Sequence, residues 1–205
     1  MFSTPPLQPI SDNLFAQKVY ADILRLDLIH PVISGNKWYK LKYYLQEAIA
    51  LKAATVATFG GAYSNHIVAT ACAAKVAGLQ SFGVIRGEKS AMLSHTLEDA
   101  AGYGMQLHFV SREAYRDKNS IKENFKDYFW IDEGGFGAAA AKGAGEILDN
   151  VSLNDYTHII TAVGTGATFA GIVKKMLPHQ KEIGISVMKN NLELIDQIKS
   201  LLTKE

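Results

Sequence analysis

The chain has 205 residues, of which 48% are hydrophobic and 20% are charged, enough apolar material for one large domain or two small ones. Its 21 basic and 20 acidic residues leave a formal net charge of +1, which excludes the strongly basic surface that nucleic acid or an anionic membrane requires. Cys72 is the only cysteine, so no disulfide can form within the chain. The first residues lack the basic and then apolar pattern of a secretory leader, and no apolar run reaches a membrane span of about 20 residues. We therefore expect a cytoplasmic protein without nucleic-acid or membrane partners.

The first fifty residues differ in character from the rest. Three prolines among the first ten residues predict a surface tail. Val19 to Leu26 reads as a strand, and Lys37 to Ala50 as a helix. The apolar face of that helix comprises Trp38, Leu41, Leu45 and Ala48.

From Ala53 onward, short β-branched or aromatic runs alternate with longer alanine-rich runs, and glycine often separates them. The predicted strands are Thr55–Phe59, Ser81–Ile85, Gln106–Val110, Tyr128–Ile131, His158–Val163 and Ile183–Met188. The predicted helices are Asn65–Ala77, Ala91–Gly102, Ser111–Phe125, Ala138–Asp149, Thr168–Leu177 and Asn191–Leu202. This alternation predicts an α/β fold with open parallel sheets in three layers, whose ligands bind beyond the carboxyl ends of the strands.

A first candidate motif is Ser34-Gly-Asn-Lys37, a turn that leads into the first predicted helix. An ammonium group sheltered from water near the positive end of a helix has a lowered pKa, which favours the free amine needed to form an imine. Taken alone, Lys37 is better explained as a solvated surface lysine beside a turn. Lys40 and Lys42 are expected to be ordinary surface lysines.

A second motif, Gly60-Gly-Ala-Tyr-Ser-Asn-His66, joins a predicted strand to a predicted helix. Its glycines permit close backbone approach, and its last residues place a hydroxyl, an amide and an imidazole at the start of the helix. Helix capping by Ser64 or Asn65 is the alternative explanation, and His66 fits a simple polar contact.

A third motif, Gly164-Thr-Gly-Ala-Thr168, also joins a strand to a helix. Backbone N–H groups, two hydroxyls and a helix amino terminus together can hold a phosphate. The motif matches neither the P-loop nor the dinucleotide fingerprint GxGxxG, because position 169 is Phe169. A glycine turn without a ligand is the alternative.

A fourth turn, Asp132-Glu-Gly-Gly135, could use Glu133 to orient a neighbouring group, or could leave it as a solvated carboxylate. No zinc or nucleophile-elbow motif is present, and the six histidines are not spaced as pairs for one metal ion. We therefore expect no metal site.

In this order, the four motifs resemble the signature of the 1-aminocyclopropane-1-carboxylate deaminase and D-cysteine desulfhydrase family. The resemblance runs from about Pro9 to the end of the chain. It implies the fold type II arrangement of pyridoxal 5'-phosphate enzymes, with a small domain (49–150) inserted into a large one (1–48 and 151–205).

The resemblance also implies roles for individual residues. Lys37 would form the Schiff base with pyridoxal 5'-phosphate and would move protons at the substrate α-carbon. Asn65 would contact the 3'-oxygen of the cofactor, and Ser64 would lie beside the substrate carboxylate or act on the substrate. The phosphate would bind to Gly164, Thr165, Gly166, Ala167 and Thr168.

Two departures from the family pattern stand out. Ala167 occupies a position where the family more often has glycine, and the family continues for roughly a hundred further residues. We expect the shortened large domain to expose an apolar sheet face, and the chain to form a homodimer.

The predicted reaction breaks a small amino acid, of the 1-aminocyclopropane-1-carboxylate or D-cysteine type, into ammonia and a 2-oxo acid. A relative that binds the cofactor without turnover, and a lyase or racemase on another amino acid, share every motif. Tyr63 and Phe136 are candidates for the substrate pocket, although core packing explains either equally well.

Overall fold

The computed structural model describes residues 2–10, 19–149 and 151–203. The strands are β1 (Leu7–Pro9), β2 (Asp22–Leu24), β3 (Thr55–Gly60), β4 (Gln80–Arg86), β5 (Met105–Val110), β6 (Phe129–Ile131), β7 (His158–Val163) and β8 (Lys181–Ser186). The helices are α1 (Lys37–Ala50), α2 (Asn65–Val76), α3 (His95–Gly102), α4 (Lys118–Glu123), α5 (Ala138–Gly145), α6 (Ala167–Val173) and α7 (Leu194–Leu202). The α/β class with parallel sheets is confirmed.

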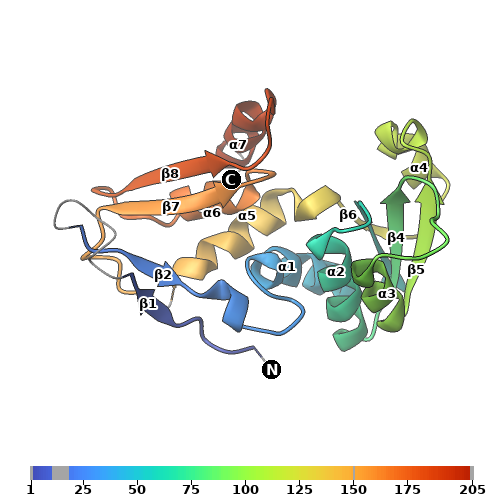
Figure 1. Cartoon of the computed structure of the whole chain (residues 1–205), viewed down its shortest axis with the longest axis horizontal. Helices are drawn as coiled ribbons and strands as arrows, with labels where there is room; N and C mark the ends of the chain where they lie inside the picture. The colour runs from blue at the N-terminus through green and yellow to red at the C-terminus, as the bar shows by residue number, and fades with distance from the viewer. Residues whose placement is uncertain (1, 11–18, 150, 204–205) are drawn as a thin grey trace.

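A four-stranded parallel sheet in the order β5-β4-β3-β6 forms one side of the molecule (Figure 1). Every residue of β3 is buried, as expected for a central strand covered on both faces. On one face, Val56 and Ile85 belong to apolar clusters that include residues of α1, α2 and α3. On the other face, Phe59 and Phe82 pack with Tyr115 and with Ile121 of α4. The sheet is therefore the middle of three layers.

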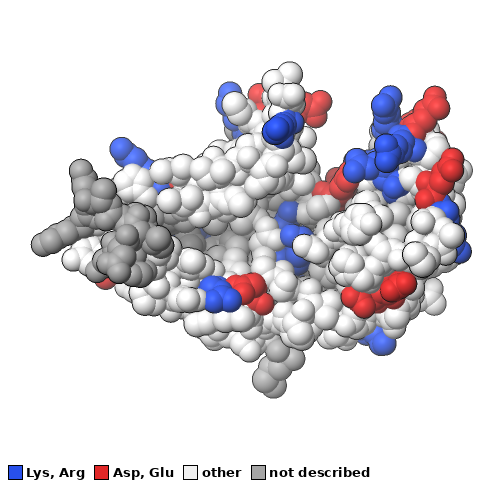
Figure 2. Space-filling model, viewed as in Figure 1, with Lys and Arg blue, Asp and Glu red and all other residues white. Residues whose placement is uncertain are grey.

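The second parallel sheet pairs β7 with β8, from His158 opposite Lys181 to Val163 opposite Ser186. One face packs on α6, where the ring of Phe169 lies against Gly184. On the opposite face, the side chains of Ile160 and Ile185 are 69% and 55% exposed. An exposed apolar sheet face is thus present among the described residues, and the surface over β7 and β8 is mostly uncharged (Figure 2).

Helix α5 lies between α1 and α6 and brings the two sheets together (Figure 1). The contact with α1 is so close that a Cβ on Gly143 would come within 1.9 Å of the Tyr39 carbonyl oxygen. A Cβ on Gly171 of α6 would lie 2.2 Å from the Ala141 carbonyl oxygen. Glycine at these positions permits the close helix packing that sets the amino end of α1 beside the loop after β7.

Several sequence predictions need correction. The proline-rich start is not a free tail, because Leu7–Pro9 forms β1 and pairs antiparallel with β2. The predicted strand Val19–Leu26 is reduced to β2 itself.

The helix predicted over Ser111–Phe125 is divided into a 3-10 turn and the short α4, because Asp117 adopts a non-helical backbone conformation. The Asp117 side chain accepts a hydrogen bond from the Ser120 N–H and so starts α4 anew. The last strand begins and ends two residues earlier than predicted. No helix in the described ranges combines the length and apolar character needed to cross a bilayer.

Candidate active site

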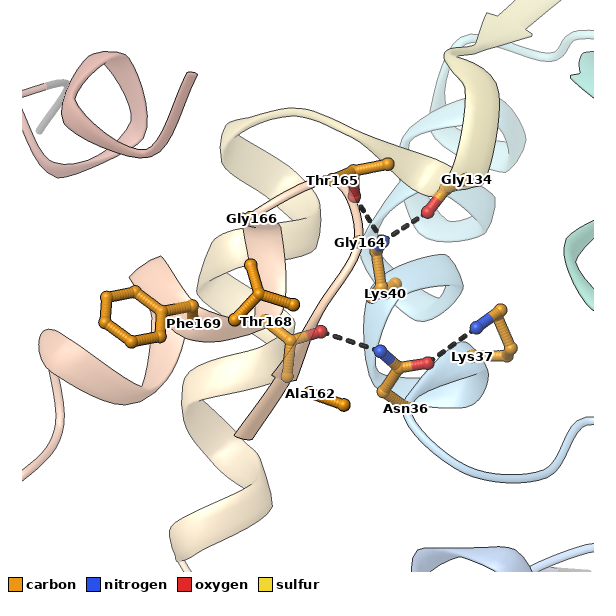
Figure 3. A pocket seen from close by; sticks show the side chains of 11 residues that line it. Asn36, Lys37, Lys40, Gly134, Ala162, Gly164, Thr165, Gly166, Thr168 and Phe169 are labelled. Carbon is orange, nitrogen blue, oxygen red and sulfur yellow. Dashed lines mark hydrogen bonds between the residues drawn. The ribbon is translucent and has the colours of Figure 1, made fainter. Parts of the chain in front are cut away.

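Three segments that are distant in sequence enclose a cavity of about 130 Å³ (Figure 3). The first is the amino end of α1, the second is the turn at Gly134, and the third is the loop that follows β7. Five residues predicted from the sequence line this cavity: Lys37, Gly164, Thr165, Gly166 and Thr168. The first and third motifs are therefore brought together, as expected for loops at the carboxyl ends of parallel strands.

Lys37 is the first residue of α1, and its side chain is partly buried. Its Nζ donates a hydrogen bond of 2.7 Å to Oδ1 of Asn36. Burial lowers the pKa of Lys37 below its ordinary value. A lowered pKa increases the fraction of neutral amine, the form that reacts with an aldehyde.

Lys40 lines the cavity and was not predicted from the sequence to do so. It is 3% exposed, contrary to the predicted surface position. Its Nζ donates to the Gly134 carbonyl oxygen and, at 3.2 Å, to the Thr165 hydroxyl. Burial, and next the charge of Lys37, lower the pKa of Lys40 to about 7. The spacing of three residues from Lys37 was the available signal, because residues i and i+3 share a helix face.

Lys42 also departs from the expectation of an ordinary surface lysine. Its side chain is 16% exposed and forms an ion pair with Glu146. Lys42 does not line the cavity. It therefore helps to hold α1 against the end of α5 rather than contributing to the site.

The glycine-rich loop supplies hydrogen-bond donors. Within the described parts of the chain, the backbone N–H groups of residues 164–168 donate to no other protein group. Gly166 has φ +84°, and a Cβ there would lie 2.6 Å from Cγ1 of Ile198, so this position requires glycine. Because α6 has only seven residues, we assign the site to the loop and Lys40 rather than to the helix dipole.

Ala167 does not line the cavity. It is fully buried, and its methyl group packs in a cluster with Ala140 and Ala141 of α5. The methyl group therefore points away from the cavity, which explains why alanine fits where the family more often has glycine.

The second motif contributes at a neighbouring cavity of about 360 Å³. Lys37 and Asn65 both line this cavity. Ser64 is the N-cap residue of α2, but its side chain makes no capping hydrogen bond and lines neither cavity. Tyr63 is 75% exposed, Phe136 packs near Ala140, and neither lines the two cavities.

His66 lies beneath the lysines and is 3% exposed. Its Nε2 is 2.9 Å from the Thr58 hydroxyl, which itself donates to the Ile131 carbonyl oxygen at 2.8 Å. The Thr58 oxygen must therefore accept a proton from Nε2, which assigns the proton to that nitrogen. Burial, and next the charges of Lys40 and Lys37, hold the pKa of His66 well below its ordinary value. His66 is thus neutral and adds no positive charge beside the lysines.

The turn after β6 covers the site from the other side. Glu133 forms an ion pair of 2.7 Å with Lys118, and both side chains are more than a third exposed. Glu133 is therefore neither free in solvent nor in contact with the cavity, and it holds the turn to α4. The turn presents its Gly134 carbonyl oxygen to Lys40.

These groups together suit a small anionic aldehyde. The loop N–H groups, the Lys40 ammonium and the hydroxyls of Thr165 and Thr168 can hold a phosphate. Lys37 lines this cavity and also the larger one beside it. In the described ranges, no three histidine, cysteine or acidic side chains are grouped as metal ligands.

Two curated relatives that match this chain have names of the same enzyme type. A Thermotoga maritima protein, whose name assigns it provisionally as a 1-aminocyclopropane-1-carboxylate deaminase, is 32% identical over 88% of this chain and 63% of its own length. The Arabidopsis thaliana bifunctional D-cysteine desulfhydrase/1-aminocyclopropane-1-carboxylate deaminase is 30% identical over 73% of this chain and 43% of its own length. The chain thus spans less than two thirds of the length of these relatives.

Solved structures show the same fold. The crystal structure of an ACC deaminase homologue superposes with a TM-score of 0.77 at 24% identity, covering 98% of this chain and 65% of the other. Threonine deaminase isoform 2 from Solanum lycopersicum gives a TM-score of 0.69 at 22% identity, covering 90% of this chain and 51% of the other. The family model described as "Pyridoxal-phosphate dependent enzyme" matches residues 10–197. The chain belongs to the family of pyridoxal-phosphate dependent enzymes.

Proposed function

We propose that the cavity at the amino end of α1 binds pyridoxal 5'-phosphate, with Lys37 as the residue joined to its aldehyde. The observation that carries this proposal is the buried Lys40 ammonium, which points at a loop with unpartnered N–H groups. A buried cation and a row of free donors are costly unless an anion binds between them. The phosphate would be held by the backbone N–H groups of Gly164, Thr165, Gly166, Ala167 and Thr168, together with the Lys40 side chain.

When bound, pyridoxal phosphate withdraws electrons from the bond that breaks at the substrate α-carbon. The chain's own groups would aim the substrate and move protons. Lys37, whose pKa is lowered by burial, would take up or return a proton at the α-carbon. Asn65, which shares the larger cavity with Lys37, would contact the 3'-oxygen of the cofactor. Ser64 would serve the substrate carboxylate.

The proposed reaction releases ammonia and a 2-oxo acid from a small amino acid of the 1-aminocyclopropane-1-carboxylate or D-cysteine type. The names of curated relatives that match this chain support this reaction class. The second candidate is a chain that binds the cofactor without turnover. This candidate is favoured by the position of Ser64, which lines neither cavity. Ser64 carries the only hydroxyl that is proposed to contact the substrate.

The domain limits and the assembly are proposals as well. We place residues 49–150 in a small domain and residues 1–48 and 151–205 in a large one, because β3 to β6 form one sheet within the first range. The exposed apolar face of β7 and β8 supports a homodimer. Sedimentation velocity tests the dimer directly, and a single monomeric species at micromolar concentration would exclude it.

The reaction is tested by incubating the protein and pyridoxal phosphate with a panel of small D- and L-amino acids. Ammonia and the 2-oxo acid are measured separately for wild type, Lys37→Ala and Lys40→Met. We expect release by wild type, none above background by Lys37→Ala, and weakened cofactor affinity with residual turnover in Lys40→Met. Cofactor binding without release of either product from any amino acid would favour the second candidate.

A further inference from the structure

Asn36 connects the reactive lysine to the glycine-rich loop. Its Oδ1 accepts a hydrogen bond of 2.7 Å from Nζ of Lys37, and its Nδ2 donates one of 2.8 Å to the Thr168 hydroxyl (Figure 3). Asn36 and Thr168 are 132 residues apart in the sequence. Asn36 is the N-cap residue of α1, yet its side chain makes no capping hydrogen bond. The amide is therefore used for this link rather than for starting the helix.

The two hydrogen bonds that connect Lys37, Asn36 and Thr168 run in the same direction. Lys37 donates to Asn36, and Asn36 donates to Thr168. Because the Thr168 oxygen accepts, its own proton is free to donate onward. Thr168 is 8% exposed and lines the cavity together with Gly164, Thr165 and Gly166 of the loop. The next acceptor in line is thus an anion bound to the loop.

Chains of hydrogen bonds that point the same way polarise one another in a low-dielectric site. An anion that accepts the Thr168 proton makes the Thr168 oxygen a better acceptor for Asn36. The Asn36 carbonyl in turn becomes a better acceptor for Lys37. The Lys37 amine then donates one N–H to Asn36, and its lone pair points away from the Asn36 amide.

We propose that Asn36 is a positioning residue that transmits occupation of the glycine-rich loop to the amine of Lys37 through the Thr168 hydroxyl. The identity of the anion as a cofactor phosphate rests on the proposed function, whereas the link itself rests on the two hydrogen bonds. The consequence is an order of events. The phosphate group binds first, and its binding fixes the amine in the orientation from which it attacks.

The test measures the reactivity of Lys37 in the cofactor-free full chain, with inorganic phosphate as the probe. Trace acetylation with isotope-labelled acetic anhydride and peptide mass spectrometry gives the rate at Lys37 relative to exposed Lys52. In wild type, saturating phosphate should raise this relative rate by about threefold, which corresponds to a hydrogen bond strengthened by roughly 0.6 kcal/mol. Binding of phosphate is monitored separately by ³¹P NMR line broadening.

Two matched comparisons isolate the link. Thr168→Val removes the hydroxyl at nearly constant shape and Thr168→Ser retains it, while Asn36→Ala leaves every loop donor in place. We expect the full phosphate response in Thr168→Ser and less than half of it in Thr168→Val and in Asn36→Ala. Thermal unfolding confirms that each variant is folded, and either removal variant alone is sufficient for the comparison.

Two negative results have different meanings. An equal phosphate response in wild type, Thr168→Val and Asn36→Ala would overturn the proposal, because the anion would then act on Lys37 directly through space. Failure of wild type to bind phosphate at all would contradict both the proposed link through Asn36 and the proposed cofactor site. In the first case the proposed cofactor site still stands, because phosphate binds to the protein.

Discussion

Replacement of Lys40 by methionine gives the sharpest test of the buried charge at this site. Methionine preserves most of the side-chain volume and removes the titrating group. In the folded protein the pKa of Lys40 is lowered from 10.5 to about 7, first by burial and second by the charge of Lys37. In the unfolded chain the same group keeps its ordinary value.

The sign of the pH effect follows from these two values. Below about pH 7 Lys40 carries its proton in both states, and above about pH 10 it carries none in either. Between these limits the unfolded chain holds a proton that the folded protein lacks, so stability rises with pH. The full lowering of the Lys40 pKa corresponds to about 4 to 5 kcal/mol of unfolding free energy, at roughly 1.4 kcal/mol for each pH unit.

Urea denaturation of the cofactor-free protein at a series of pH values measures this slope. The difference in unfolding free energy between wild type and Lys40→Met should change by about 1.4 kcal/mol per pH unit between neutral and alkaline pH. Lys75→Met, which replaces an exposed lysine of α2, serves as the control and should leave the slope unchanged. If the unfolding free energies of wild type and Lys40→Met changed with pH in parallel, the burial and the lowered pKa of Lys40 would be refuted.

Three further predictions concern the scaffold beneath the site. Thr58→Val should destabilise the fold by about 2 to 4 kcal/mol in urea denaturation, because Nε2 of His66 and the Ile131 carbonyl both lose a buried partner; a loss below 1 kcal/mol would contradict the assigned network. Gly143→Ala should cost at least about 3 kcal/mol of unfolding free energy, because its Cβ would overlap the Tyr39 carbonyl. The matched change Gly102→Ala, with open space around it, should be neutral or stabilising by up to about 1 kcal/mol. Similar urea midpoints for the two variants would argue against the close α1–α5 contact. Glu133→Gln should lower stability by less than about 1 kcal/mol at low salt, since its ion pair with Lys118 is partly exposed, and a larger loss would mean that Glu133 has a buried role.

The elements with a strong local pattern were predictable from the sequence. Helix α1 begins and ends at the residues predicted, because Leu41, Leu45 and Ala48 recur at helical spacing and are buried. Strand β7 also matches its predicted limits. Both elements carry motifs to the cavity, which is why the proximity of Lys37 and the loop from Gly164 to Thr168 could be predicted without the structure.

The features that were missed depend on contacts between distant segments. Lys40 is buried because Gly134 and Thr165, 94 and 125 residues away, close over its amine. Strand β1 exists only through its pairing with β2 across a connection that no periodicity indicates. The roles of Ser64 and Asn65 stay predictions, because the structure shows where they lie and not what they bind.

The most direct measurement of the central claim is borohydride reduction of the protein with added pyridoxal phosphate, followed by peptide mapping. Two lysines line the cavity, and burial lowers the pKa of both. We predict that the reduced adduct forms on Lys37, is absent from Lys40, and disappears in Lys37→Ala. An adduct on Lys40, or none on either lysine, would contradict the assignment of Lys37 as the residue that binds the cofactor.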